Sequence, residues 1–180
     1  MAVLVLMLVL SGVAYLPQYI FGDRSDYRRA LRYGMAGGFI FTGLDHFLTP
    51  SRYVPMMPRF LAEYAMELIY LSGAAELVGA LGLLVPLVVY RRLRLPDLRK
   101  WAGIGLALML SVIVIANINV AVQGTQVQGL AFGRWYYWVR LLLQPIFIVW
   151  ALFVGDVIRR RDTAAARSRQ PFETEQPLPH

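Results

Sequence analysis

The sequence predicts an all-α integral membrane protein, a helical bundle with five transmembrane helices. Of its 180 residues, 58% are apolar and 16% are charged, whereas soluble domains have about 45–50% apolar and about 25% charged residues. The apolar residues are concentrated in runs long enough to cross a bilayer, and most of the basic residues flank these runs. Together these observations exclude a soluble globular enzyme, a disordered chain and a collagen-like fibre.

Five runs are predicted to span the membrane, because a crossing helix needs about 20 mostly apolar residues. They cover residues 1–22, 31–48, 68–90, 101–122 and 135–155. The first and fourth runs carry no charge, the second has no charge between Arg32 at its start and Asp45, and the third and fifth carry only Glu76 and Arg140. The predicted membrane domain therefore covers residues 1–157, and the basic segment 158–180 is expected to be a disordered cytoplasmic tail.

The first run has an alternative interpretation as a cleaved signal peptide. Gly12, Val13 and Ala14 resemble a small-residue cleavage site. However, a signal peptide begins with basic residues, and none precedes this run. We therefore favour an uncleaved helix.

The basic residues predict the orientation of the chain. Fourteen of the 18 lie on one side of an alternating five-span path, and only Arg52, Arg59, Arg134 and Arg140 belong to the other side. Because positive residues favour cytoplasmic loops, we expect the N-terminus outside and the C-terminus in the cytoplasm.

Polar residues within the spans are expected in their outer halves. At about 1.5 Å of rise per residue, Glu76 lies about 12 Å below the outer surface, Arg140 about 8 Å and Gln144 about 13 Å. Polar groups in lipid need a partner or a function, so these depths predict a polar cluster that opens outward. The predicted cluster comprises His46, Glu76, Asn117, Arg140 and Gln144, with Asp45, Glu67 and Asn119 at its periphery.

Glu76 and Arg140 are the most favourable pair within this cluster, since their depths differ by about one helical turn. Such a pair either fixes the register of two helices or lines a binding site, and the sequence leaves both alternatives open. Gly34 and Gly38 form a GxxxG pattern, which is typical of a face where two membrane helices pack closely.

The sequence contains no pattern typical of a catalytic or metal site. The chain has no cysteine, and the only histidine besides His46 is His180 in the tail. We therefore expect neither a bis-histidine haem nor a multi-histidine zinc site. His46 is expected to lie beside Asp45 at the interface, with contact to a quinone as an alternative. No phosphate loop or nucleic-acid-binding face is expected.

Several motifs resemble those of the DoxX family of small bacterial membrane proteins. They lie between about Ala30 and Gly155 and include His46-Phe47, Leu71-Ser72-Gly73 with Glu76, Gly82 to Pro86, Ala116-Asn117-Ile118, and Arg140 with Gln144. Pro50, Tyr53 and Met57-Pro58 also match. The chain departs from the family pattern at Leu61-Ala62, Ile115 and Leu142. The resemblance implies a compact four-helix core, here extended by an extra N-terminal span, in a bacterial cytoplasmic membrane.

The resemblance also implies an association with membrane redox chemistry. Our leading hypothesis is a non-catalytic subunit or scaffold of a membrane redox or oxidative-stress assembly, with an oxidoreductase or a second copy of the chain as its partner in the bilayer. The alternatives are a quinone-interacting oxidoreductase component and a transporter of protons or a small solute. A quinone is the one cofactor that the resemblance suggests, and we expect no enzymatic activity from the chain alone.

Overall fold

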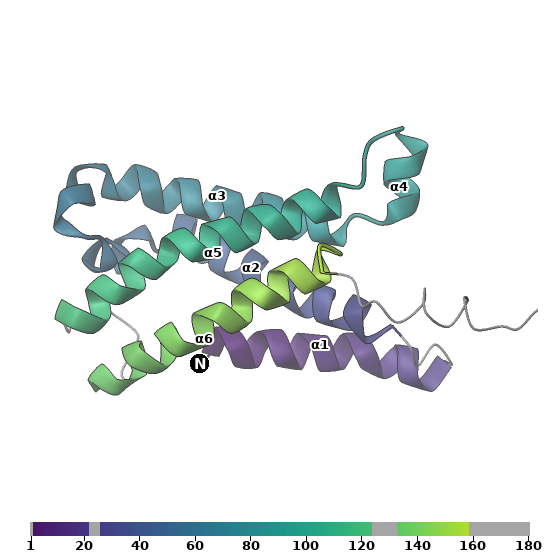
Figure 1. The fold of residues 1–180 in the computed structure, drawn as a ribbon, viewed down its shortest axis with the longest axis horizontal. Helices are drawn as coiled ribbons and strands as arrows, with labels where there is room; N and C mark the ends of the chain where they lie inside the picture. Colours follow the sequence, from purple (N-terminus) through teal and green to yellow (C-terminus); the bar gives the residue numbers. More distant parts are fainter. Residues whose placement is uncertain (1, 22–25, 124–132, 159–180) are drawn as a thin grey trace, which may run out of the picture.

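The computed structural model describes residues 2–21, 26–123 and 133–158, and these residues form helices joined by short connections (Figure 1). This arrangement confirms the all-α prediction. The predicted tail lies, apart from Val157 and Ile158 at its start, outside the described residues. The elements in chain order are α1 (Ala2–Phe21), α2 (Tyr27–Leu48), the 3-10 helices η1 (Pro50–Arg52), η2 (Val54–Met56) and η3 (Arg59–Tyr64), α3 (Ala65–Leu84), α4 (Leu87–Arg92), α5 (Leu98–Gln123) and α6 (Gly133–Val154).

Four of the described helical segments are long and apolar enough to cross a membrane. They are Val3–Phe21, Arg59–Leu84, Leu98–Gln123 and Trp135–Val154. The length and composition of these helices are those of a membrane protein. The second predicted span, α2, is as long as α6 but less apolar, because Arg28, Arg29, Arg32 and Asp45 lie along it.

The third predicted span ends earlier than the sequence suggests. It was expected over residues 68–90, whereas α3 ends at Leu84 and a separate helix, α4, begins at Leu87. Pro86 causes the break, since it lacks a backbone donor and disfavours a helical conformation in the residue before it. Accordingly, Val85 is extended, with φ −59° and ψ 123°.

α1 packs on α2 through the predicted glycine face. A Cβ atom at Gly34 would overlap Ser11 Oγ and the backbone carbonyl of Met7, and one at Gly38 would overlap the Met7 side chain. Because glycine has no side chain at these points, the two helices approach closely enough to bury Met7 and Ser11. The GxxxG prediction is confirmed.

The other four long helices form a ring. α2 packs on α3, α3 on α5, α5 on α6, and α6 returns to α2, while α1 lies on the outside of α2 (Figure 1). An apolar core fills the ring, with Met35, Phe39, Leu83, Leu106 and Val154 among its fully or almost fully buried side chains.

The two ends of the ring differ in their polar residues. One end, here called the histidine end, carries His46, Glu76 and Asn117 with the 3-10 helices. The opposite end, here called the arginine end, carries Arg28, Arg32 and Arg99 and lies beside α4.

Candidate functional site

The histidine end brings His46 on α2 and Glu76 on α3 together. His46 Nδ1 and Glu76 Oε2 are 3.9 Å apart. The two helices come close here because Gly73 has no side chain. A Cβ atom added at this position would lie only 2.7 Å from His46 Cβ and 3.1 Å from the Gly43 carbonyl oxygen. A pair of small residues therefore brings a histidine and a carboxylate into ion-pairing distance inside the bundle.

His46 is held in one orientation by two contacts. Its Nδ1 lies 2.7 Å from the carbonyl oxygen of Thr42, and its ring stacks on Tyr53 with centroids 4.0 Å apart. A carbonyl oxygen can only accept, so Nδ1 carries the hydrogen. In the neutral ring Nε2 is then an acceptor, and the site suits a ligand that donates a hydrogen bond.

Glu76 is the most unusual group of the site. Its side chain is buried, with the residue 4% exposed, and Oε2 has no hydrogen-bond partner within the described part of the chain. Buried carboxylate oxygens are normally hydrogen-bonded. This atom is thus an unused acceptor inside the bundle.

The expected Glu76–Arg140 ion pair is absent from the ion pairs formed by the described residues. The half-buried Arg140 acts electrostatically on both Glu76 and His46 without forming such a pair. His46 lies close to Glu76 because it projects from α2, which packs directly on α3.

Asp45 is the opposite case, since three donors satisfy its carboxylate. Oδ1 accepts from Thr49 Oγ1 at 2.7 Å, and Oδ2 accepts from Arg52 Nη1 at 2.8 Å and from the Tyr53 hydroxyl at 2.6 Å. Burial, followed by the hydrogen bond to Asp45, raises the pKa of Tyr53 above its ordinary value. Tyr53 therefore remains a protonated donor, and Asp45 fastens the 3-10 segment to the end of α2.

The predicted asparagine and glutamine residues join α5 to its neighbours. Asn117 Nδ2 donates to Gln144 Oε1 at 3.1 Å, and Gln144 Nε2 donates to the Leu110 carbonyl at 2.8 Å. Asn119 Nδ2 donates to the Met56 carbonyl at 3.2 Å, so α5 also holds η2. Asn117 Oδ1 is buried without a partner in the described residues.

The structure therefore divides the predicted set in three. His46 and Glu76 form a close pair near Arg140. Asn117 and Gln144 form a hydrogen bond between α5 and α6. Asp45 and Asn119 bind the 3-10 segment. Glu67 is exposed at the start of α3. Sequence reasoning did not assign Tyr53 and Thr42 to the site, although Tyr53 was among the residues that resemble the DoxX pattern.

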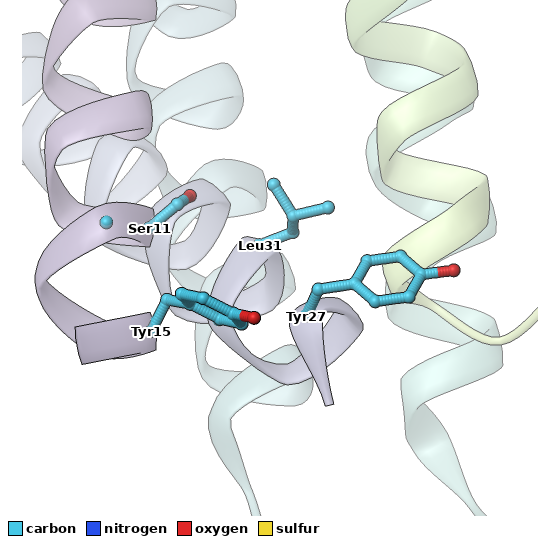
Figure 2. A pocket seen from close by; sticks show the side chains of 6 residues that line it. Ser11, Tyr15, Tyr27 and Leu31 are labelled. Carbon is cyan, nitrogen blue, oxygen red and sulfur yellow. The ribbon is translucent and has the colours of Figure 1, made fainter. Parts of the chain in front are cut away.

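No group of three or more metal-ligating side chains occurs within the described residues. A cavity of about 280 Å³ lies between α1 and α2, away from His46, and Figure 2 shows Ser11, Tyr15, Tyr27 and Leu31 around it. Its lining has no charged side chain, which suits the packing of lipid chains better than polar chemistry.

A family model for a domain of unknown function (DUF8561) matches residues 35–155. The match begins within α2, covers the rest of the ring (α3, α5 and α6) with its 3-10 segment, and leaves α1 and the first eight residues of α2 outside. No curated protein and no solved structure matches the chain.

Proposed function

The chain belongs to the DUF8561 family of unknown function, and we propose that it is a non-catalytic membrane subunit or scaffold of a redox or oxidative-stress assembly. The redox association comes from the resemblance to the DoxX family. The scaffold role comes from the way in which the chain uses its polar groups. The partner is a membrane oxidoreductase, or a second copy of the chain within such an assembly.

The use of polar groups at the histidine end is the observation that carries the proposal. Asp45, Asn119, Gln144 and the amide nitrogen of Asn117 all bind groups of the chain itself. Such contacts stabilise one arrangement of helices and 3-10 segments and leave few groups for chemistry. This is what a structural subunit needs from its intramembrane polar residues.

The proposal includes five crossings, with α2 as the fifth. α2 is less apolar than the other long helices but packs on α1, α3 and α6. These contacts bury Arg32 and His46, so neither side chain faces lipid, whereas the exposed positions Phe41, Leu44 and Leu48 are apolar. The arrangement is that of a DoxX-like four-helix core with α1 added, in a bacterial cytoplasmic membrane with the arginine end in the cytoplasm.

Affinity purification of the tagged full chain from its native host in mild detergent tests the scaffold role. We expect oxidoreductase subunits to co-elute in stoichiometric amounts, as measured by quantitative mass spectrometry. An unrelated tagged multi-span protein, purified in parallel, gives the background. Recovery of the chain alone, without a stoichiometric partner, would contradict the proposal.

The unpaired Glu76 oxygen favours a second candidate function, contact with a quinol. Glu76 Oε2 and His46 Nε2 would both accept hydrogen bonds, which suits the hydroxyl groups of a quinol better than the carbonyl groups of a quinone. Lipid extraction of the same purified sample tests this function. Quinol, measured together with the quinone that forms from it by oxidation during extraction, should be retained by the native chain and lost from Glu76→Gln, in which one acceptor oxygen is replaced by a donor amide. Equal retention by both would exclude this role for Glu76.

A further inference from the structure

A second polar site lies at the arginine end, remote from His46. The start of α2, the end of α3 and the start of α5 enclose a cavity of about 240 Å³. Its polar lining comes from Arg29, Arg32, Arg99, Tyr33 and Asp26, and Leu83 and Leu84 form an apolar wall. Three guanidinium groups against one carboxylate make the cavity positive.

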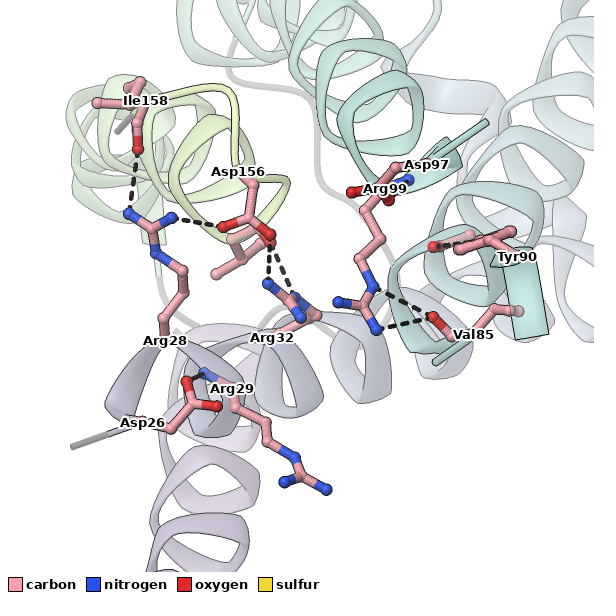
Figure 3. Close-up of polar contacts among 12 residues, drawn as sticks. Asp26, Arg28, Arg29, Arg32, Val85, Tyr90, Asp97, Arg99, Asp156 and Ile158 are labelled. Atoms are coloured by element: carbon pink, nitrogen blue, oxygen red, sulfur yellow. Dashed lines mark hydrogen bonds and ion pairs between the residues drawn. The ribbon is translucent and has the colours of Figure 1, made fainter. Parts of the chain in front are cut away.

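Arg32 and Arg99 form the interior of this site. Figure 3 shows their guanidinium groups close together in the space between α2 and α5, and each repels the other electrostatically. Arg32 is 9% exposed, and Asp156 compensates only part of the positive charge, because Arg28 also binds its carboxylate. Two neighbouring guanidinium groups in a half-enclosed space create a strong preference for an anion.

Both arginines keep donors for a ligand. Arg32 donates through Nε to the Val154 carbonyl, 2.9 Å away, and through Nη2 to Asp156. Arg99 donates through Nε and Nη2 to the Val85 carbonyl, at 3.1 and 3.0 Å. Within the described residues, Nη1 of Arg32 and Nη1 of Arg99 form no hydrogen bond. The existing contacts thus fix the position of both side chains and leave donors unused.

Arg29, Tyr33 and Asp26 form the rim. Arg29 Nε lies 3.4 Å from the Tyr33 hydroxyl oxygen, so the hydroxyl accepts and its own hydrogen remains free to donate. The Asp26 side chain accepts from the backbone N–H of Arg29 at 3.0 Å and caps α2. The rim acid therefore has a structural role, while the rim base and hydroxyl add to the attraction for an anion.

We propose that this pocket binds a phosphate group, presented by an anionic phospholipid headgroup or by free phosphate. Its place at the helix ends is where headgroups lie if α3 and α5 cross a bilayer, and basic pockets between membrane helices are suited to such headgroups. A phosphate has several acceptor oxygens that point in different directions, so it can accept from Arg32 on α2 and from Arg99 on α5 at the same time. The volume lies below the ~300 Å³ lower limit of typical drug-sized sites and suits a headgroup.

Thermal unfolding of the delipidated full chain in neutral detergent, followed by tryptophan fluorescence, tests the proposal. The probes are dioleoyl phosphatidylglycerol, dioleoyl phosphatidylcholine, and sodium phosphate against sodium chloride of equal ionic strength. We expect a saturable rise in Tm with phosphatidylglycerol and none with phosphatidylcholine. A saturable rise with sodium phosphate but not with phosphatidylglycerol would support the phosphate site and identify free phosphate as its ligand.

Variants show whether the pocket is responsible. Arg99→Gln should weaken binding about tenfold, because it removes a charge-assisted contact. Arg29→Gln changes an exposed residue of the rim and should weaken binding about threefold, a smaller loss than that of an interior contact. Arg92→Gln is the matched control, with the same change of charge on exposed α4 outside the pocket lining, and should bind as the native chain does. The proposal is overturned if neither phosphate probe stabilises the chain saturably, or if all three variants bind alike.

Discussion

Two carboxylates of the histidine end show how strongly the surroundings decide the role of a residue. Asp45 accepts hydrogen bonds from Thr49, Arg52 and Tyr53. Glu76 is more deeply buried, yet Oε2 has no such donor within the described residues. The hydrogen bonds of Asp45 therefore stabilise the fold, whereas no hydrogen bond from the described residues to Glu76 Oε2 offsets the free-energy cost of burying that oxygen. The contacts give Asp45 a structural role, and they leave Glu76 Oε2 as an acceptor without a donor among the described residues.

Isosteric replacement of each carboxylate separates these roles. Asp45→Asn should lower the free energy of unfolding by about 2 kcal/mol, because charge-assisted hydrogen bonds from Arg52 and Tyr53 are lost. Glu76→Gln should leave stability unchanged or raise it, since a buried charge is removed and no hydrogen bond to Oε2 is broken. Thermal unfolding in detergent measures both.

The two replacements serve as controls for each other, because each exchanges one carboxylate for an amide of the same shape at the same end of the ring. A larger loss of Tm in Glu76→Gln than in Asp45→Asn would contradict the assignment. It would mean that Glu76 is the structural group of the pair.

The sequence predicted how deep each polar residue lies along its helix, but not which side chains of neighbouring helices touch. The rise per residue brought His46, Glu76 and Arg140 to one end of the molecule. It could not show that the rotation of α3 directs Glu76 toward His46, since α3 is apolar on all sides and has no one-sided pattern. The close approach depends on Gly43 and Gly73, whose contacts across two helices appear only in three dimensions.

At the scale of elements, the docking of α1 on α2 depends on a missing side chain. Gly34 leaves space for the Met7 carbonyl and for Ser11, and Ser11 Oγ in turn donates to the Met7 carbonyl at 2.7 Å. Backbone cannot move aside as the tip of a flexible side chain can. Any side chain at this position should therefore separate the two helices.

Two glycine-to-alanine replacements test this docking. Gly34→Ala should destabilise the protein by about 1–3 kcal/mol through overpacking. Gly12→Ala on the neighbouring helix should be neutral or stabilising by up to about 1 kcal/mol, because a Cβ atom there meets nothing within 4 Å. Thermal unfolding gives the stabilities, and limited proteolysis shows whether α1 detaches. Equal stability of the two variants would contradict close packing at Gly34.

Helix ends were predicted well where an apolar run and a helix end together, and poorly where a proline ends the helix inside an apolar run. Hydropathy placed the start of α5 and both ends of α6 within three residues of their position in the structure, since apolar runs and helices coincide there. Hydropathy alone extended the third span to residue 90, because Leu87, Val88 and Val89 continue the apolar run past Pro86. Backbone chemistry, which hydropathy does not measure, ends α3 at Leu84.

At the scale of the whole molecule, the chain has two polar ends separated by an apolar core. Among the described residues, the histidine end holds two buried acceptors without a partner, Glu76 Oε2 and Asn117 Oδ1, and the arginine end holds a positive cavity with unused donors. Composition predicted the membrane and the basic side, because both depend on sums over many residues. The ring closed by α2 and α6 depends on contacts between residues far apart in the chain, which a single sequence does not show.

Five crossings, with the histidine end outside and the arginine end in the cytoplasm, underlie both proposals. The absence of native cysteine makes single-cysteine labelling a direct test. Glu63→Cys and Leu95→Cys place one exposed thiol at each end, in η3 and after α4. In intact cells, a membrane-impermeant maleimide should label Glu63→Cys and should reach Leu95→Cys only after permeabilisation. Labelling of both positions in intact cells, or of Leu95→Cys alone, would contradict this topology.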